Sequence, residues 1–463
     1  MDILGVIDRI TSGFSNFMWG TPLLVLLIGG GLYFTIYCRF VPFRFFGHAV
    51  NILRGKYDNP DDPGDITHFQ ALSSALASTV GMGNISGVAV AIYTGGPGAL
   101  FWMWVSAVVG MATKFFTCTL AILYRGTDDR GDVQGGPMYF IETGLGRKFR
   151  PLGILFSVAG LFGCLSLFQA NQLTQIIRDE VFRPNGLFVL SPHLGNLLVG
   201  LAMAILVSSV IFGGIKRIGY VASRMVPFMV ALYMLAGLIV LIRNYSQVPG
   251  LLGLIVSDAF RGKAVAGGAM GVVLITGIKR AAFSNEAGIG TEALAHGAAK
   301  TKEAVREGLV AMLGPFVDTI IVCSVTALVI LISGTWQGGT ANGVTLTTNA
   351  FTSELGTVGR LLLLIAVITF SISTMIGYSY YGCKCTGYLF GTRWKQTYNR
   401  FYVLALVIGA LVSIDVVINF LDGMFAVMAI PTMTSALLLS PKVMAEARRY
   451  FDTLKQKEKE PSR

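Results

Sequence analysis

Charged side chains are scarce in this sequence. Asp, Glu, Lys and Arg make up 13% of its 463 residues, whereas a typical soluble domain carries about 25%. Hydrophobic residues reach 53%. So few charges cannot cover the surface of a water-soluble chain of this length. The composition therefore excludes an ordinary soluble protein and predicts a polytopic protein that crosses a lipid bilayer.

Residues that build metal centres and active sites are also few. The four His are scattered without a zinc pattern, and among the six Cys only Cys383 and Cys385 are closely spaced. The other four Cys lie in apolar runs, where small buried residues are the simpler interpretation and a metal pair at Cys383 and Cys385 is the weaker one. No nucleophile–base pair or phosphate-binding loop is present. We therefore expect no catalytic residue and no cofactor.

Apolar segments long enough to cross a bilayer, which takes about 20 residues, recur along the whole chain. We expect eleven spans, at 17–38, 68–93, 99–124, 152–177, 196–214, 221–242, from 263 to about 288, 305–333, 358–382, 401–418 and 421–439. Short helices are expected at 137–145 and 250–261, and an amphipathic helix from Lys442 onward. The predicted fold class is all-α.

The basic residues indicate how these spans are oriented. The formal charge is +11, which in other proteins can indicate nucleic-acid binding. Here 28 Lys and Arg lie in segments on one side of the predicted spans, 7 lie on the other side, and Lys114 lies within a span. Because Lys and Arg are retained in the cytoplasm, we expect the N-terminus outside, the C-terminus inside, an inner-membrane location and no nucleic-acid partner. The sequence indicates no protein partner, and the N-terminus lacks the features of a signal peptide.

Two of the spans are interrupted. The second contains a Gly- and hydroxyl-rich run at 78–87, and the seventh contains several glycines followed by a polar half. Helix breaks occur in bilayers where the freed backbone lines a cavity or binds a ligand. Without the first span, the broken spans begin two groups of five that cross in opposite directions, as in an inverted repeat. We divide the chain into an N-terminal helix and loop (1–67), the first repeat (68–243), an outer connection (244–262), the second repeat (263–440) and a cytosolic tail (441–463).

The breaks offer the chemistry needed to bind a zwitterion. Free N–H groups at a half-helix favour a carboxylate, and free carbonyls favour Na⁺ or an ammonium group, so an amino acid is the expected ligand. We predict substrate contacts at Thr79, Gly81, Met82 and Gly83 in the first break and at Thr276, Gly277 and Ile278 in the second. The alternative is close packing of small residues, which we favour for Gly87, Gly110 and Gly163.

Polar residues in two other spans complete this prediction. Gln169 lies in span four with Asn171 and Gln172, and amides in hydrocarbon are costly unless they face a polar cavity. Gln169 is the expected ligand contact, whereas the other two fit interhelical hydrogen bonds or the outer mouth equally well. In span nine, Thr369, Ser373 and Thr374 share a helix face. We predict further substrate contacts at Thr369 and Ser373, and the hard oxygens of this face also suit Na⁺. Hydrogen bonds to their own helix are the alternative.

Charged residues within the expected spans form a further group. We expect Lys279, Arg280, Glu286 and Asp318 to lie near the cytosolic side as an ionic gate or an ion-pair network, with a proton relay through Asp318 or Glu286 as the weaker alternative. The remaining charged residues within the spans are Lys114, Glu292, Asp415 and Asp422.

Several motifs resemble the alanine or glycine:cation symporter family. They are the runs at 81–87 and 94–104, the Gly-Gly-Pro-Met-Tyr-Phe segment at 135–140, the segments 277–280 and 283–288, and 308–319. The resemblance covers nearly the whole chain. It implies the five-plus-five fold of the leucine-transporter class with one extra N-terminal helix, and Na⁺- or H⁺-coupled uptake of alanine or glycine.

The resemblance also implies roles for individual residues. The first break (Thr79, Gly81, Met82, Gly83) matches the substrate backbone site, and Gln169 matches a pocket glutamine. The Na⁺ ligands would be the carbonyls of Ala77, Val80 and Phe370 with the hydroxyls of Ser373 and Thr374. Two departures affect the choice of substrate: many relatives have Thr where this chain has Met82, and a Glu where it has Cys383.

The sequence thus predicts a secondary transporter that couples Na⁺ to a small neutral amino acid, alanine and/or glycine, by alternating access. A proton-coupled symporter is the alternative. A channel or facilitator for a small solute is less favoured, because a continuous pore has no need of two matched helix breaks.

Overall fold

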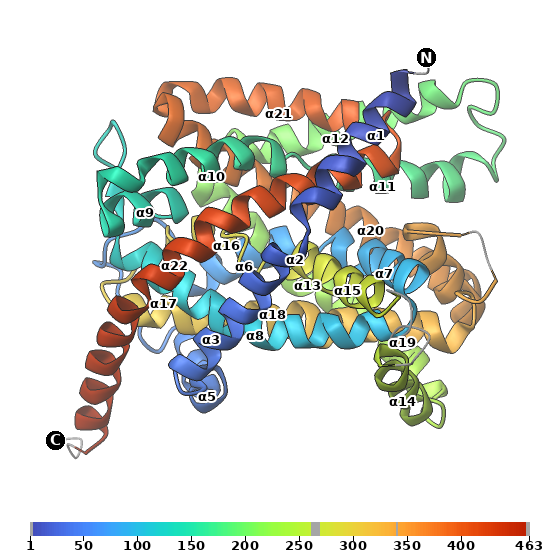
Figure 1. The fold of residues 1–463 in the computed structure, drawn as a ribbon. Coiled ribbons are helices and arrows are strands. Elements are labelled where there is room, and N and C mark those ends of the chain that lie inside the picture. The colour runs from blue at the N-terminus through green and yellow to red at the C-terminus, as the bar shows by residue number, and fades with distance from the viewer. Residues whose placement is uncertain (1–2, 261–268, 339–340, 460–463) are drawn as a thin grey trace.

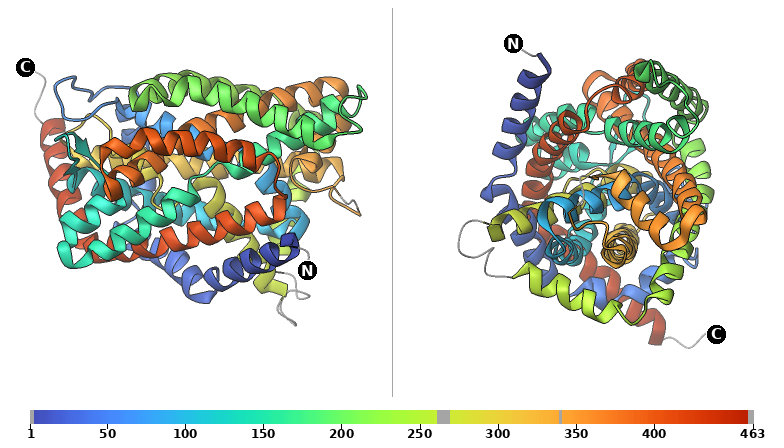
Figure 2. Two further views of the ribbon diagram at one scale, coloured as in Figure 1. Left: turned by 90° about the horizontal axis from the view of Figure 1, so that it is seen from above. Right: turned by 90° about the vertical axis from the view of Figure 1, so that its right-hand side faces the viewer.

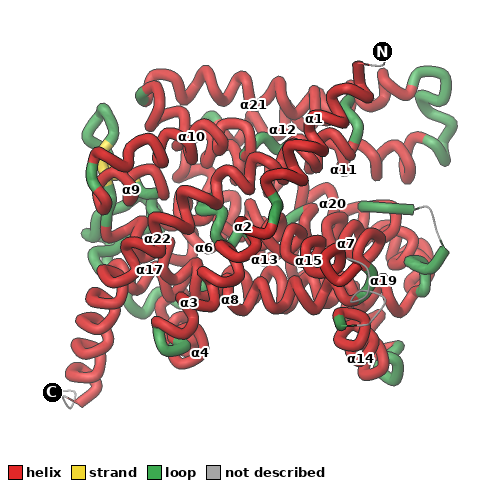
Figure 3. The backbone as a smooth tube through the Cα atoms, in the orientation of Figure 1, coloured by secondary structure: helices red, strands yellow, loops and turns green. Residues whose placement is uncertain are grey.

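The computed structural model describes residues 3–260, 269–338 and 341–459, and this part of the chain is a bundle of helices (Figure 1). Most helices run between the two ends of an elongated body, and most loops lie at those ends (Figure 3). The described residues contain one pair of strands, an antiparallel hairpin of β1 (Gly126–Thr127) and β2 (Val133–Gln134). The fold is therefore all-α, as predicted.

The helices of the first part of the chain follow the predicted apolar segments. They are α1 (Ile3–Met18), α2 (Thr21–Leu24), η1 (Val25–Gly29), α3 (Gly30–Tyr37), α4 (Val41–Arg44), α5 (Phe46–Leu53), α6 (His68–Thr79), η2 (Gly83–Gly87), α7 (Val88–Gly95), α8 (Gly98–Leu123), α9 (Pro137–Leu145), η3 (Arg147–Phe149), α10 (Arg150–Gly163), α11 (Leu167–Ile177), η4 (Arg178–Phe182), α12 (Pro192–Ile211) and α13 (Gly214–Arg243).

The second part has fewer but longer elements. They are α14 (Val248–Ala259), α15 (Ala269–Asn285), α16 (Glu292–His296), α17 (Ala304–Ala311), α18 (Leu313–Pro315), η5 (Phe316–Cys323), α19 (Ser324–Ser333), α20 (Val344–Phe390), η6 (Thr392–Trp394), α21 (Lys395–Gly409) and α22 (Ile414–Lys459). The surface helix expected at 250–261 corresponds to α14. The tail expected from Lys442 is continuous with the last span in α22.

The number of membrane spans is bounded by helix length and hydropathy. In the described ranges seven helices are long and apolar enough to cross a bilayer, or up to nine if two bent helix pairs each count as one span. The bent pairs are Ile7–Met18 with Thr21–Tyr37, at 50°, and His68–Thr79 with Gly83–Gly95, at 49°. The seventh and tenth predicted spans correspond to α15 and α21, and these helices have only 17 and 15 described residues.

The two ends of the bundle carry different parts of the chain. The C-terminal end of α22 and helix α9 lie at one end, and the N-terminus and α14 lie at the other (Figures 1 and 2). Large apolar side chains on the outer helices are exposed, for example Ile205 at 71%, Leu235 at 60% and Ile242 at 70%. Exposed apolar surface of this kind is what a bilayer covers.

Two local features position the central helices. Helix α6 begins with a capping box, in which the Thr67 hydroxyl accepts from the Gln70 N–H and the Gln70 side chain accepts from the Thr67 N–H. This satisfies amides that a helix start leaves free. Helix α20 is kinked at Gly356, whose φ is +61°. The segment 344–355 is therefore a separate short helix that runs in another direction from the long helix after Gly356.

Candidate functional site

The break in the second span is built by three residues between α6 and η2. Val80 leaves the helix with ψ of 89°, although its N–H still donates to the Leu76 carbonyl at 2.8 Å. The Gly81 N–H then donates to Asn84 Oδ1 at 2.8 Å. All residues from Ser78 to Gly87 are buried. The break predicted for span two thus lies deep inside the bundle.

Hydroxyls of α20 lie directly against this break. Ser373 Oγ donates to the Ala77 carbonyl at 3.1 Å. A Cβ added at Gly81 would overlap Thr374 Oγ1 and lie 3.7 Å from the Phe370 carbonyl. Thr374 Oγ1 is buried and has no hydrogen-bond partner. The predicted oxygen ligands therefore come together at one place, and one of them is free to bind a ligand. Hard oxygens of this kind suit Na⁺.

Thr369 does not join this group. Its hydroxyl donates to the Ile365 carbonyl at 2.9 Å and to the Ala366 carbonyl at 3.0 Å, both in its own helix. Back-bonding of this sort is common for Thr in membrane helices. For Thr369 the structure therefore agrees with the alternative interpretation of the sequence pattern, a hydrogen bond of the hydroxyl to its own helix.

Asn84 connects the break to a buried carboxylate that the sequence had not linked to it. Asn84 Nδ2 donates to the carbonyl and to Oδ1 of Asp318, at 2.9 and 2.8 Å. Ser284 and Thr319 donate their hydroxyl protons to Asp318 Oδ2, at 2.8 and 2.7 Å. Asp318 is completely buried. Broken span two, the end of α15 and η5 are therefore joined through one carboxylate.

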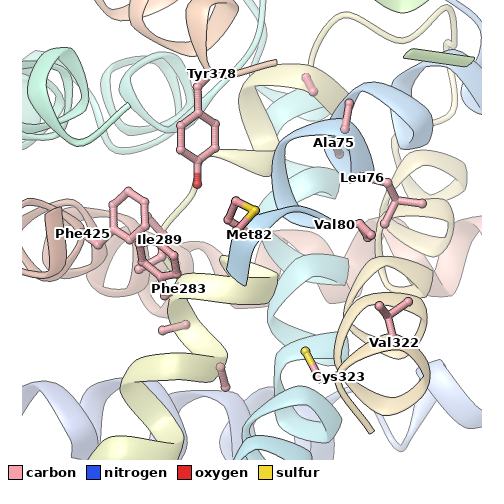
Figure 4. Close-up of a cluster of buried hydrophobic side chains, with 14 of the residues drawn as sticks. Ala75, Leu76, Val80, Met82, Phe283, Ile289, Val322, Cys323, Tyr378 and Phe425 are labelled. Carbon is pink, nitrogen blue, oxygen red and sulfur yellow. The ribbon is translucent and has the colours of Figure 1, made fainter. Parts of the chain in front are cut away.

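A cluster of buried, mostly apolar side chains lies next to Met82. The side chains of Phe283, Ile289, Tyr378 and Phe425 gather beside it (Figure 4), and all are at most 4% exposed. The ring centroids of Phe283 and Phe425 are 5.7 Å apart. That these four side chains lie together was not predicted from the sequence, since they come from three separate helices and the loop after α15. The cluster gives the break in span two an apolar neighbour.

The amides of α11 have separate roles. Gln169 is buried and its Oε1 has no partner in the described structure. Gln172 lies one turn away, and its Oε1 accepts from Ser86 Oγ and from the Val344 N–H. Asn171 donates to the Val412 carbonyl at 2.6 Å. Gln172 and Asn171 thus make interhelical hydrogen bonds, whereas Gln169 carries an unused acceptor.

Comparison with known proteins places this chain in a family. The model of the sodium:alanine symporter family matches residues 4–463. The chain belongs to the sodium:alanine symporter family. It is 40% identical to the sodium/alanine symporter AgcS of Methanococcus maripaludis, over 99% of this chain and 100% of that protein. It is also 38% identical to an uncharacterized transporter of Haemophilus influenzae, over 97% of each.

More distant comparisons agree with the fold. The chain is 33% identical to the probable sodium/glutamine symporter GlnT of Bacillus subtilis, over 98% of this chain and 93% of that one. A crystal structure of MhsT in complex with L-phenylalanine superposes with a TM-score of 0.57 at 14% identity, covering 83% of this chain and 99% of MhsT. This chain therefore has the fold of MhsT, and as a member of a symporter family it is a transporter.

The seventh span of this symporter is interrupted at a different place from the one predicted. Helix α15 is continuous through Gly277, where an added Cβ would lie 2.5 Å from the Ala99 carbonyl and 2.6 Å from Trp102 Cβ. Thr276 packs against Gly95 and Ile278 is 3% exposed. These residues are in helix–helix contacts, as small residues in membranes commonly are.

The chain leaves the helix at Glu286 instead. This residue has a φ of +57°, which is unusual for a residue with a side chain and is often found at functional sites. Its carboxylate accepts hydrogen bonds from Tyr378 and Thr291. Residues 286–291 are not helical and are followed by the short α16. This conformation could not be predicted from the sequence, because one partner of Glu286, Tyr378, comes from the distant helix α20.

The four residues Lys279, Arg280, Glu286 and Asp318, predicted to form an ionic gate or an ion-pair network, do not pair with one another in the described structure. Both basic side chains pair with Asp422 of α22, Lys279 at 3.5 Å and Arg280 at a shorter distance. The two carboxylates accept hydrogen bonds from neutral side chains, as described above. Two basic residues on one turn of α15 favour a shared acidic partner on the neighbouring helix, which sequence spacing alone did not reveal.

A polar cavity of about 510 Å³ opens near the strand hairpin. Its walls include the ends of α12 and α13, the hairpin and α20. Lys384 and Gln134 lie in this wall, and the Lys384 Nζ donates to the Gln134 Oε1. Ser379, less than two turns from Thr374 on α20, also lines it. The cavity therefore approaches the broken helix from the end of the bundle that carries α9 and the C-terminus.

Proposed function

We propose that this protein is a secondary active transporter that carries a small neutral amino acid, alanine and/or glycine, into the cell together with Na⁺ by alternating access. The observation that carries the proposal is the buried break at Val80–Met82 with an unpartnered Thr374 hydroxyl beside it. Membership of the sodium:alanine symporter family supports it, as does the similarity to a sodium/alanine symporter at 40% identity.

In this proposal the substrate binds where the first break meets the cluster of side chains beside Met82. Backbone groups of Thr79, Gly81, Met82 and Gly83 contact the carboxylate and ammonium groups of the amino acid. Gln169 supplies its unused amide oxygen to the ammonium group. Met82 and the aromatic side chains are bulky and buried beside the break, which favours alanine or glycine over larger substrates.

Na⁺ is the transported partner ion in this mechanism. The carbonyls of Ala77, Val80 and Phe370 and the hydroxyls of Ser373 and Thr374 would hold it between α6 and α20. An ion there joins the inner half of the broken helix to α20 and so fixes the backbone that binds the substrate. Binding of either ligand then strengthens binding of the other, and the Na⁺ gradient drives uptake.

The proposed topology follows the same pattern. We infer two inverted five-helix repeats, 68–243 and 263–440, that begin with the interrupted spans and follow one extra N-terminal helix. The fold shared with MhsT supports this arrangement. The excess of Lys and Arg on one side supports a cytosolic C-terminus and an outer N-terminus, so the polar cavity near the hairpin faces the cytosol.

Proton coupling is the second candidate. The buried carboxylates of Asp318 and Glu286 lie next to the interrupted helices, and buried carboxylates in membranes often carry protons. Each of these carboxylates accepts at least two hydrogen bonds from neutral side chains. Na⁺ is favoured because the matching family is that of sodium:alanine symporters and a 40% identical relative is a sodium/alanine symporter.

Uptake by purified protein in proteoliposomes separates these functions. Radiolabelled alanine and glycine should accumulate when Na⁺ is higher outside and should only equilibrate when Na⁺ is equal on both sides. Accumulation driven by a pH gradient at equal Na⁺ would instead establish proton coupling. Uptake that never exceeds the external concentration under either gradient would show a facilitator and refute the symport proposal.

A further inference from the structure

Three titratable side chains meet in the interior, away from the proposed transport site. His68 is the first residue of α6, His296 is the last of α16, and Glu307 lies in α17. His68 Nδ1 is hydrogen-bonded to Glu307 Oε2, and His296 Nδ1 lies 2.5 Å from Glu307 Oε1. All three are at most 1% exposed. We call this group the His–Glu–His triad.

The triad lies at a seam between the inner half of span two and the segment that follows span seven. Backbone hydrogen bonds cross this seam. The N–H groups of Asp65 and Ile66 donate to the Ala298 carbonyl, and the Lys300 N–H donates to the Ile66 carbonyl at 2.7 Å. Arg125 adds donors to the carbonyls of Gly297 and Ala299. In this structure the seam is therefore closed, and the triad is its buried end.

The charges around the triad come from each neighbouring element. The charged side chains that act on it are Arg125 from the loop after α8, Asp58 from the loop before α6, and Arg306 from α17, and the neutral thiol of Cys118 from α8 lies near them. Glu292 of α16 also acts on Cys118 but is hydrogen-bonded to Thr117. Further out, Arg449 and Tyr450 of α22 interact with Glu303 and Arg306 rather than with the triad.

Proton counting shows why this group binds a proton. Two imidazoles that each donate from Nδ1 to one carboxylate carry a total charge of −1 when both are neutral. One more proton, on an Nε2 atom, makes the group neutral and turns one contact into an ion pair. A buried group without net charge avoids the cost of an isolated buried charge. His296 Nε2 is buried and has no hydrogen-bond partner in the part of the chain that the structure describes, so this atom is open to a proton.

We propose that His68, Glu307 and His296 form a proton-binding site that holds the start of α6 against α16 and α17 while a proton is bound. Loss of the proton leaves a buried negative charge and weakens the seam. Because α6 is the inner half of the broken helix, the site would set how readily the proposed transporter opens toward the cytosol. That last consequence rests on the proposed function; the proton site itself does not.

Hydrogen exchange measured by mass spectrometry tests the site without any substrate. Exchange of the peptide covering 68–79 in the purified full chain is compared at pH 6 and pH 8, with each rate divided by that of an unstructured peptide at the same pH. The wild type should be better protected at pH 6, by up to roughly tenfold for each pH unit over which the proton is lost. Equal protection at both values would overturn the proposal.

Matched variants assign the effect to the triad. The double variant His68→Asn with His296→Asn keeps a side-chain donor toward Glu307 at each position but cannot take up a proton, so its protection should not depend on pH. His193→Asn, in an exposed position, should behave like the wild type. Glu307→Gln is a second variant that should also lose the pH effect. A pH effect of wild-type size in both the double variant and Glu307→Gln would contradict the assignment.

A transport measurement then separates this inference from the proposed function. In proteoliposomes with fixed outer pH, wild-type Na⁺-driven uptake should be slower with an internal pH of 6 than of 8, and the double variant should lose this difference. A pH effect on exchange without any Na⁺-driven uptake would leave the proton site standing and refute the transport proposal. Na⁺-driven uptake with no pH effect on exchange would support the transport proposal and refute the proton site.

Discussion

At the scale of single residues, the proposed transport site contains two side-chain oxygens whose hydrogen-bonding capacity is unused. Gln169 Oε1 and Thr374 Oγ1 are both buried and both lack a partner among the described residues. A buried polar atom without a partner costs about 1–3 kcal/mol. That cost is recovered only when a ligand arrives, so these two atoms are the most informative positions for substitution.

Gln169→Ala should raise the alanine concentration for half-maximal uptake by more than about tenfold, because it removes a hydrogen bond to a charged group. Saturation curves at fixed Na⁺ measure the change. Gln247→Ala is a matched control, since Gln247 is exposed outside the bundle. An unchanged curve for Gln169→Ala would remove this residue from the proposed substrate site.

The double variant Ser373→Ala with Thr374→Ala should raise the Na⁺ concentration for half-maximal uptake by about tenfold, since two hydroxyl ligands are lost. The Na⁺ dependence of uptake at saturating alanine is the measurement. Thr369→Val is the control, because the Thr369 hydroxyl bonds to its own helix. If Thr369→Val shifts the Na⁺ dependence and the double variant does not, the ion lies on another face of α20.

At the scale of elements, the break of span two depends on the absence of a side chain at one position. A Cβ at Gly81 would collide with Thr374, whereas at Gly87 the nearest atom would be the Met82 carbonyl oxygen at 3.9 Å. Gly81→Ala should therefore push α6 and α20 apart and abolish most Na⁺-driven uptake, and Gly87→Ala should leave it near the wild-type rate. Initial uptake rates, normalised to protein amount, measure both. Similar rates for the two variants would show that contact at Gly81 is unimportant.

The elements also show how far sequence reasoning reached. Apolar length predicted α8, α12 and α14 to within four residues at each end, whereas α13 begins seven residues before the predicted span. The agreement arises because an apolar run that crosses a bilayer must satisfy its backbone hydrogen bonds within a helix. The prediction failed at Gly277, where a glycine serves helix packing instead of a break. Glycine permits both outcomes, and only the neighbouring Ala99 and Trp102 decide between them.

The same limit applies to the proposed site. The hydroxyls of Ser373 and Thr374 were predicted because their helical spacing is local information. The links from Asn84 to Asp318 and from Glu286 to Tyr378 join residues far apart in sequence. One sequence without relatives aligned to it contains no signal for such pairs. Buried carboxylates could be identified as functional candidates, but their partners could not.

At the scale of the whole molecule, the charge distribution predicts one orientation in the membrane. Green fluorescent protein fused after residue 463 should fluoresce, and alkaline phosphatase fused there should be inactive, if that end is cytosolic. Fusions after Arg243, between spans six and seven, should give the opposite pattern. The same reporter response at both positions would contradict an odd number of spans between them.

The length of helix α22 connects the last span to a distant part of the molecule. Its 46 residues extend about 69 Å at 1.5 Å per residue, more than twice the hydrocarbon thickness of a bilayer, about 30 Å. The part after Pro441 alone is about 27 Å long, and much of it packs on the rest of the protein. Val443, Ala447 and Tyr450 are buried, and Phe451 stacks on Phe45, which lies between α4 and α5. A tilt of the last span would therefore also move the segment around Phe45, far from it in the sequence.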